Sequence, residues 1–336
     1  MSLDRQARAM LPLIETELKR QVRRLAAPST RGFHDMLAYH MGWTGTSARK
    51  GQGKRIRPLL TLLVNASVGG RWRDAAPAAA ALELVHNFSL VHDDIQDNSP
   101  TRRGRATLWK KVGAPLAINA GDALFTIAGQ ATLDLARSFE PAAVLAAAGI
   151  LQQACLDLTK GQFLDLYHQG ARHLSITGYW QMIDGKTAAL IAACTHIGAL
   201  LGGASPAKSQ QYRRFGQLLG LAFQVQDDIL GIWGEEARTG KSAASDLVEG
   251  KLSLPVIYGL RNKGEFSRRW RDAHARASNA PRLRKLLEQE GALEHSTRQA
   301  NRLTREAVAA LRRLRPQGEA GTALEELSAQ LLARRG

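Results

Sequence analysis

The chain has 336 residues, 44% of them hydrophobic, so it can bury a large core and is too apolar to be disordered. Ala and Leu dominate while Val, Ile and aromatic residues are sparse, which favours helices over strands. The 46 basic and 30 acidic residues give a net charge of +16, which suits nucleic acid, an anionic membrane surface or phosphorylated substrates.

The cysteines and the distribution of apolar residues indicate the cellular compartment in which we expect the protein. Cys155 and Cys194 are isolated and form no disulfide framework, which favours a reducing environment. The first residues are polar and lack the apolar run of a signal peptide. No stretch reaches about 18 uninterrupted apolar residues, so we expect a cytoplasmic protein with no transmembrane segment.

Apolar residues recur at helical spacing along most of the chain. Met10, Leu11, Ile14 and Leu18 predict a first helix, and an irregular Gly-rich stretch follows it. The later predicted elements are helices over 58–68, 78–97, 116–136, 141–169, 176–201 and 209–232, a polar loop over 233–250, and a helical remainder. We therefore expect one all-α domain over residues 1–336, a large helical bundle with a central cavity.

An aspartate cluster ends the predicted helix 78–97. Asp93 and Asp97 are four residues apart, so their carboxylates share a helix face, and Asp94 lies beside them. Carboxylates near a helix C-terminus oppose the helix dipole, so a bound cation explains them better than a solvated acidic helix end. Oxygen ligands that bridge to phosphate suit Mg²⁺.

A second acidic pair, Asp227 and Asp228, follows another apolar helical run more than a hundred residues later. One acidic cluster could be accidental. Two of them, each embedded in an apolar helix, suggest two facing helices that clamp a shared metal–diphosphate group. The alternative is two separate acidic patches beside the core.

Short groups of cations accompany these clusters. Arginine binds phosphate oxygens in a bidentate way and lysine adds a point charge, although each one alone is more often a surface charge. Adjacent arginines cannot face one direction, so Arg102 and Arg103 could serve two phosphate groups. The cationic groups are Lys54, Arg55 and Arg57; Arg102, Arg103 and Arg105; Lys186 with Thr187; and Lys241 and Lys251.

Five segments in order resemble the signatures of the trans-isoprenyl diphosphate synthases, the polyprenyl synthetase family. Residues 84–104 and 223–231 resemble its first and second aspartate motifs. Residues 53–58, 185–187 and 250–255 are similar to its three other signatures. The resemblance implies an all-α enzyme, usually a homodimer, that condenses isopentenyl diphosphate with an allylic diphosphate, 1′ to 4, with trans geometry.

The resemblance also implies residue roles. Asp93, Asp97 and Asp227 would ligate three Mg²⁺ ions, while Asp94 and Asp228 would orient ligands and metal-bound water. The allylic diphosphate would be held by Arg102, Lys186, Thr187, Gln224, Lys241 and Lys251. Isopentenyl diphosphate would be held by Lys54, Arg57, His86 and Arg103. In the family, the released diphosphate is thought to take the proton, so no protein base is needed.

Two positions bear on how this chain differs from its relatives. Gly231 stands where many relatives carry a third aspartate in the second motif, which leaves Asp227 and Asp228 there. Phe88 and Ser89 lie five and four residues before Asp93, and relatives with this pattern tend to stop at geranylgeranyl diphosphate (C20). We expect that product, with farnesyl diphosphate next.

Three alternatives remain from the sequence. A terpene cyclase shares the aspartate motif but acts on a single prenyl diphosphate and has no need of a second phosphate site. A non-catalytic subunit of a heteromeric synthase would have lost aspartates from one motif. A helical protein that binds nucleic acid is supported by net charge alone, and we expect no nucleic-acid partner.

Overall fold

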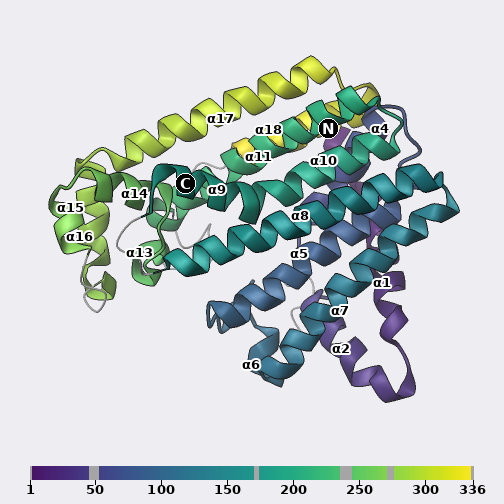
Figure 1. The fold of residues 1–336 in the computed structure, drawn as a ribbon, viewed down its shortest axis with the longest axis horizontal. Helices are drawn as coiled ribbons and strands as arrows, with labels where there is room; N and C mark the ends of the chain where they lie inside the picture. Colours follow the sequence, from purple (N-terminus) through teal and green to yellow (C-terminus); the bar gives the residue numbers. More distant parts are fainter. Residues whose placement is uncertain (1, 45–52, 170–173, 235–243, 271–275, 334–336) are drawn as a thin grey trace. The chain divides into compact units, whose positions relative to one another are not determined.

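The computed structural model describes residues 2–44, 53–169, 174–234, 244–270 and 276–333. Its fold is all-α, as the composition and periodicity predict (Figure 1). The α-helices are α1 (Ser2–Val22), α2 (Arg31–His40), α4 (Ile56–Ser67), α5 (Ala76–Gln96), α6 (Leu108–Val112), α7 (Ala114–Leu133), α8 (Pro141–His168), α9 (Ile176–Ile183), α10 (Ala189–Leu201), α11 (Pro206–Trp233), α13 (Ser245–Glu249), α14 (Leu254–Arg261), α15 (Glu265–Arg269), α16 (Arg276–Gln289), α17 (Ala292–Leu314) and α18 (Gly318–Leu332).

Shorter elements complete the description. A π-helical turn, η4 (Asp184–Ala188), separates α9 from α10. Strands β1 (Thr101–Arg102) and β2 (Arg105–Ala106) pair antiparallel directly after α5. Three 3₁₀ turns are η1 (Arg23–Leu25), η2 (Pro28–Thr30) and η3 (Asp134–Arg137).

The chain forms two compact units. Unit 1 comprises residues 1–152, 193–212 and 315–327, and unit 2 comprises 153–192, 213–314 and 328–336. The helices α8, α10, α11 and α18 each contribute residues to both units. The single domain over 1–336 and its central cavity stay predictions.

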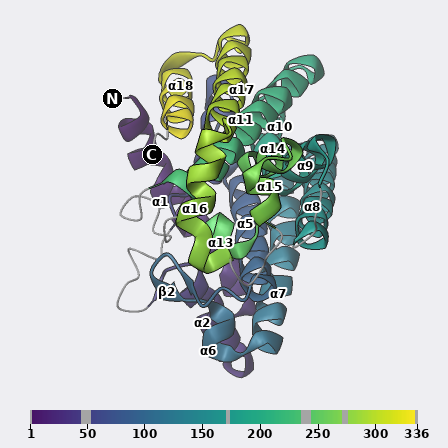
Figure 2. The same cartoon turned by 90° about the vertical axis from the view of Figure 1, so that its left-hand side faces the viewer.

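Helix α5 forms the centre of unit 1. Its first half is rich in alanine, and small side chains let neighbouring helices approach closely; Leu82, Leu84 and Val85 are fully buried. Helix α7 runs beside it (Figure 1). The Asp97 N–H donates to the Asp93 carbonyl at 2.8 Å, so the helix ends at the aspartate cluster. The β1–β2 hairpin then turns back next to α2 and α6 (Figure 2).

Close backbone contact shapes the π-turn in unit 2. A Cβ on Gly161 of α8 would lie 2.0 Å from the Lys186 nitrogen, and one on Gly185 would lie 2.5 Å from the Asp157 carbonyl oxygen. Only glycine at both positions permits this approach. The contact places η4, a hydrogen-bonding irregularity often found at functional sites, directly against α8.

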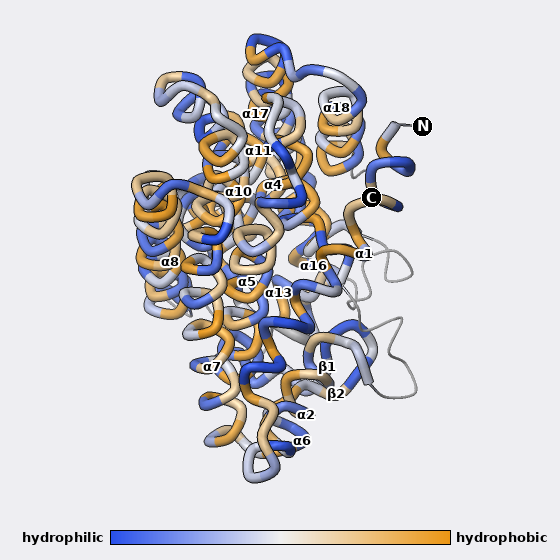
Figure 3. Tube along the Cα trace, turned by 90° about the vertical axis from the view of Figure 1, so that its right-hand side faces the viewer, coloured by the Kyte–Doolittle hydropathy of each residue, from blue (hydrophilic) through white to orange (hydrophobic). Residues whose placement is uncertain are grey.

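Helix α8 is unusually apolar for its exposure. By length and composition it could cross a bilayer, with a mean hydropathy of 1.4 and 33% of that window buried. Polar residues such as Asp157, Lys160 and Asp165 interrupt it. Figure 3 shows its hydrophobic positions in orange. Large apolar side chains at the surface of a helix are typical of a face that another surface covers.

The predicted helices are confirmed to within a few residues for 78–97, 141–169 and 209–232. The predicted stripe of the C-terminal part, Leu303, Ala307, Leu311 and Leu314, is buried on α17. The prediction of a loop throughout 233–250 was wrong, because α13 begins at Ser245 and Asp246 and Leu247 are buried there. The β1–β2 hairpin had not been predicted.

Candidate active site

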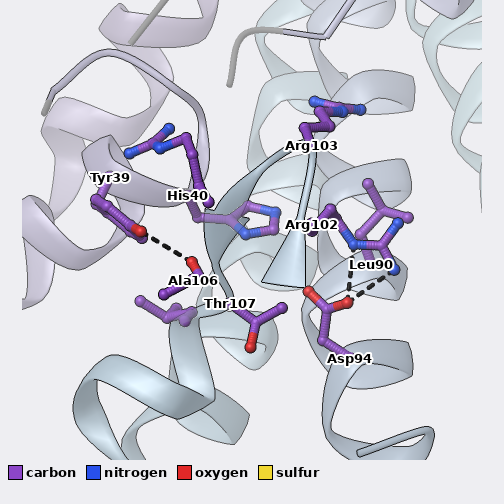
Figure 4. Close-up of a pocket in the computed structure, with 10 residues that line it drawn as sticks. Tyr39, His40, Leu90, Asp94, Arg102, Arg103, Ala106 and Thr107 are labelled. Carbon is purple, nitrogen blue, oxygen red and sulfur yellow. Dashed lines mark hydrogen bonds and ion pairs between the residues drawn. The ribbon is translucent and has the colours of Figure 1, made fainter. Parts of the chain in front are cut away.

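The three aspartates of the first cluster differ in how deeply they are buried. Asp94 is 2% exposed, Asp93 is half-buried and Asp97 is exposed. The Arg102 guanidinium donates to Asp94 Oδ1 through Nε and Nη2, each at 2.8 Å (Figure 4). Burial raises the pKa of Asp94, and Arg102 opposes that shift. Asp94 therefore anchors the hairpin arginine, and Asp93 and Asp97 are the accessible members.

The two adjacent arginines take different directions, as predicted. Arg102 turns to Asp94, whereas Arg103, at a left-handed φ of +53°, points away from it (Figure 4). A Cβ on Gly53 would lie 2.8 Å from Arg103 Nη1, so this guanidinium rests against the backbone next to Lys54. The structure thus brings Arg103 to the basic segment that precedes α4.

Arg57, His86 and Arg103 form a cationic group in unit 1. Burial, then Arg57 and Arg103, lower the pKa of His86 well below its ordinary value, so its imidazole is neutral at pH 7. Burial also lowers the pKa of Arg57, which Glu83 partly offsets. Within the described residues, the buried Arg57 Nε has no hydrogen-bond partner. An orphaned donor among cations fits an anionic ligand. Lys54 is exposed nearby in sequence.

His40, at the end of α2, belongs to the same region and was not predicted. It lines a pocket of ≈ 30 Å³ with Asp94, Arg102 and Arg103 (Figure 4). Burial and the neighbouring arginines lower its pKa to about 3, and its buried Nε2 has no partner in the described parts of the chain. No sequence signal singles out His40, because its proximity depends on how α2 packs.

Arg55, in contrast, has a structural role. It lies at a left-handed φ of +49° directly before α4 and is 3% exposed. Its Nε donates to Glu15 Oε1 at 2.6 Å and its Nη1 to Glu83 Oε1 at 2.9 Å. This buried pairing fixes the backbone between Lys54 and Arg57.

In unit 2, Asp228 is buried among neutral donors. Its Oδ2 accepts from the Tyr179 hydroxyl at 2.7 Å and from the Leu254 N–H at 2.9 Å, and its Oδ1 accepts from Gln224 Nε2 at 2.9 Å. Burial raises the pKa of Asp228 to about 7, although these bonds oppose the shift. Asp227, on the adjacent face of α11, is half-buried.

Two residues of the predicted allylic diphosphate site, Thr187 and Gln224, are linked by hydrogen bonds to Asp228. The Thr187 hydroxyl donates to Gln224 Oε1 at 2.6 Å, which links the π-turn to α11. Lys186 pairs with Asp165 of α8. Lys251 is half-buried and pairs with Glu249 at 2.7 Å. Lys241 lies outside the described residues. Asp165 and Tyr179 had not been predicted, because their contacts join distant segments.

The carboxylates fit a magnesium ion that shares its ligands with phosphate. Among the described residues, no three His, Cys, Asp or Glu side chains are grouped as a cage for a metal ion. Mg²⁺ does not need such a cage, because it binds one or two carboxylates and completes its shell with water and phosphate. Asp93 and Asp97, one helical turn apart, supply such a pair.

The fold is all-α, and two aspartate clusters in it are accompanied by arginines and lysines. The sequence profile of the polyprenyl synthetase family matches residues 45–289. The chain therefore belongs to the polyprenyl synthetase family.

Individual relatives agree with this assignment. The chain is 42% identical to a geranylgeranyl diphosphate synthase of Mycobacterium tuberculosis over 68% of its length and 66% of that protein's. It is 36% identical to a (2E,6E)-farnesyl diphosphate synthase of Mycobacterium bovis over 79% and 75%. The crystal structure of geranylgeranyl pyrophosphate synthetase from Pyrococcus horikoshii superimposes with a TM-score of 0.86 at 29% identity, covering 98% of each chain. The first of these alignments spans about two thirds of the relative's own length.

Proposed function

We propose that this protein is a prenyltransferase that condenses isopentenyl diphosphate with an allylic diphosphate, 1′ to 4, to give a trans short-chain prenyl diphosphate. The observation that carries the proposal is the divergence of the adjacent arginines. Arg102 bonds to the aspartate cluster, whereas Arg103 joins Arg57 and His86. A two-substrate enzyme needs two such cationic groups, and a one-substrate cyclase needs only the first.

The Arg57 group is the proposed site for isopentenyl diphosphate. Lys54, Arg57 and Arg103 supply positive charge, and the orphaned Arg57 Nε supplies a donor. The neutral His86 can donate a hydrogen bond without adding to the repulsion among these cations. We expect each charge-assisted bond to phosphate to contribute about 1.5–3 kcal/mol.

The allylic diphosphate is assigned to the aspartates and the second set of cations. Asp93, Asp97 and Asp227 would hold Mg²⁺, three ions with substrate bound, and the metal would supply charge that stabilises the departing diphosphate. Asp94 holds Arg102 in place, and Asp228 holds Gln224. Lys186, Thr187, Gln224, Lys241 and Lys251 complete the proposed site.

These residues act by binding and orientation. Arg102 and Lys186 stabilise negative charge as the carbon–oxygen bond of the allylic substrate breaks. The double bond of isopentenyl diphosphate then attacks the allylic cation, and the released diphosphate accepts the proton. Water must be excluded because it would quench the cation.

Product length is assigned to α5. Phe88 packs against Phe125 of α7, with ring centroids 5.1 Å apart, and against His92 at 4.9 Å. Ser89 is buried and donates to the His86 carbonyl at 2.9 Å. A braced aromatic one and a half turns before Asp93 can stop a growing chain, so we propose geranylgeranyl diphosphate as the main product, with farnesyl diphosphate next.

We further propose a cytoplasmic homodimer. Leu145, Leu156, Phe163 and Tyr167 of α8 are 71%, 50%, 61% and 70% exposed. Their spacings of 11, 7 and 4 residues place them within about 40° on one helix face. A second copy offers the same apolar stripe. Light scattering should show a dimer that Phe163→Glu with Leu156→Glu converts to monomer; a monomeric wild type would contradict this.

The test of the activity uses the purified chain with labelled isopentenyl diphosphate, Mg²⁺ and an allylic diphosphate. The proposal expects label in longer prenyl diphosphates. Cyclic hydrocarbon formed from geranylgeranyl diphosphate alone would indicate a cyclase. Activity that requires a second, different subunit would indicate a partner chain of a heteromeric synthase.

A further inference from the structure

The turn between β1 and β2 has a backbone conformation that arginine disfavours. Arg102 pairs with Arg105 across the hairpin, so Arg103 and Gly104 form its two-residue turn. Both turn residues have a left-handed φ, +53° and +70°. Positive φ at both central residues is the requirement of a type I′ turn, whose first position is usually asparagine, aspartate or glycine. Because an arginine stands there instead, contacts elsewhere must hold the hairpin in this shape.

Tyr39 of α2 contacts both the hairpin and the helix that follows it. Its hydroxyl donates to the Ala106 carbonyl of β2 at 2.8 Å (Figure 4). Arg105 Cζ lies 4.1 Å from the centroid of the Tyr39 ring, and Lys111 Nζ of α6 lies 4.0 Å from the same centroid. Cations within about 6 Å of an aromatic ring are attracted by its quadrupole. One side chain therefore joins α2, β2 and α6.

Arg105 reinforces this connection. The sequence places it among the cations that could bind phosphate, but its contacts are with the protein. Its Nη2 donates to the Thr44 carbonyl at 3.0 Å, and its guanidinium lies over the Tyr39 ring. Tyr39 belongs to α2 and Thr44 follows that helix by four residues. Arg105 therefore links β2 to the α2 segment.

The other two arginines of the hairpin depend on this anchor to different degrees. Arg102 is bonded to Asp94 of α5 through two nitrogen atoms, so α5 holds its guanidinium directly. Arg103 is the first residue of the turn, so the direction of its side chain changes whenever the turn changes. A loosened β2 should therefore displace Arg103 more than Arg102.

We propose that Tyr39 is a positioning residue for the binding of isopentenyl diphosphate. By holding β2, it keeps the turn in the conformation that directs Arg103 away from Arg102 and toward the Arg57 group. The inference rests on the proposed function, because it assumes that Arg103 binds this substrate. Tyr39 acts through Arg103 and not by contact with the substrate, so a double-mutant cycle separates this role from a general structural one.

The test is the steady-state kinetics of Tyr39→Leu, which removes the hydroxyl and the ring and keeps an apolar side chain. KM for isopentenyl diphosphate should rise about 5- to 20-fold, because a displaced Arg103 binds phosphate less well. The allylic KM should change less than about threefold, because Asp94 still holds Arg102. In the Arg103→Ala background, Tyr39→Leu should raise KM for isopentenyl diphosphate by less than about twofold. Tyr39→Phe, which keeps the ring, should give an intermediate rise.

Trp72→Leu is the matched control. Trp72 is also a half-buried aromatic residue with an arginine over its ring, Arg73 Cζ at 4.3 Å, but it precedes α5 and so lies at the opposite end of that helix from Asp93. It should leave both KM values unchanged. Hydrogen–deuterium exchange adds a readout that does not depend on turnover. The amides of residues 101–107 should exchange faster in Tyr39→Leu than in the wild type or in Trp72→Leu.

Two kinetic results would overturn the proposal. One is an unchanged KM for isopentenyl diphosphate in Tyr39→Leu, and the other is an equal rise with and without Arg103. If instead Arg103→Ala itself leaves this KM unchanged, the proposed function is wrong, and the exchange data still show whether Tyr39 fixes the hairpin. Unchanged exchange of residues 101–107 in Tyr39→Leu would refute that role in either case.

Discussion

Asp94 and Asp228 are the second aspartates of the two clusters, and both are almost fully buried, but their partners differ in charge. Asp94 receives two bonds from the Arg102 guanidinium. Asp228 receives its bonds from a tyrosine hydroxyl, a glutamine amide and a backbone N–H. Burial raises the pKa of both carboxyls, and for Asp228 it reaches about 7.

The comparison shows two ways to keep a carboxylate inside a protein. A cation compensates the lost hydration of Asp94, and the same contact aims Arg102. Neutral donors compensate Asp228 less completely, but they tie α9, α11 and α14 together. Asp94 therefore positions a cation, whereas Asp228 holds neighbouring segments of the chain together.

The largest expected effect follows from removing the accessible carboxylate of the first cluster. Asp93→Ala should lower kcat about 10³-fold or more, because several kcal/mol of transition-state stabilisation are lost. Asp93 is half-buried at a helix end, so the unfolding temperature should change by no more than about 2 °C. Turnover assays and thermal unfolding by circular dichroism measure both.

The matched control for this variant is Asp35→Asn, an exposed carboxylate on α2. It should keep normal turnover. Near-normal activity of Asp93→Ala with Mg²⁺ would contradict the assignment of Asp93 to the metal.

Steady-state kinetics tests whether Arg102 and Arg103 bind different substrates. Arg103→Ala should raise KM for isopentenyl diphosphate about 10- to 100-fold, the equivalent of one charge-assisted bond, and change the allylic KM by less than about threefold. Arg102→Ala should do the reverse. If both variants raise the same KM, the two arginines serve one phosphate group and the proposed division is wrong.

The neutral partners of Asp228 are tested through stability. Tyr179→Phe removes a 2.7 Å bond to a buried carboxylate and should lower the free energy of unfolding by about 1–3 kcal/mol. Tyr212→Phe is the control, because the hydroxyl of this fully buried side chain makes, among the described residues, a single long contact of 3.4 Å with Ser67 Oγ. Urea unfolding should show a smaller loss for Tyr212→Phe; equal losses would count against Asp228 as an anchor.

Of these substitutions, we expect Phe88→Ala to change turnover least. It should nevertheless change the length of the product. Phe88→Ala removes the ring that packs against Phe125 and His92, so the product should lengthen by at least one five-carbon unit. Phe163→Ala, an exposed ring on α8, is the control and should keep the product length. Chromatography of the dephosphorylated products distinguishes the two, and an unchanged Phe88→Ala profile would exclude Phe88 as the limit.

Much of the fold could be predicted because the helices are long and apolar. The interval 141–169 matches α8 to within one residue, since apolar residues recur at helical spacing along it and no proline or turn signal interrupts it. The π-turn at Lys186 could not be predicted, because it depends on contact with Gly161 in another helix. Helix α13 was missed because only five residues form it and its burial depends on the fold.

The candidate site likewise contains residues that could be predicted from the sequence and residues that could not. Asp93, Asp97 and Asp227 could be named from spacing and resemblance, since their chemistry is visible in residue type. Tyr179 and His40 could not be predicted, because their positions near these residues depend on how distant segments of the chain pack.

The most direct measurement is product analysis of the purified wild-type chain with isopentenyl diphosphate, Mg²⁺ and each of dimethylallyl, geranyl and farnesyl diphosphate. The account predicts that every starter is extended to geranylgeranyl diphosphate and that chelation of Mg²⁺ abolishes extension. Absence of extension with every starter, or extension that persists without a divalent metal, would contradict it.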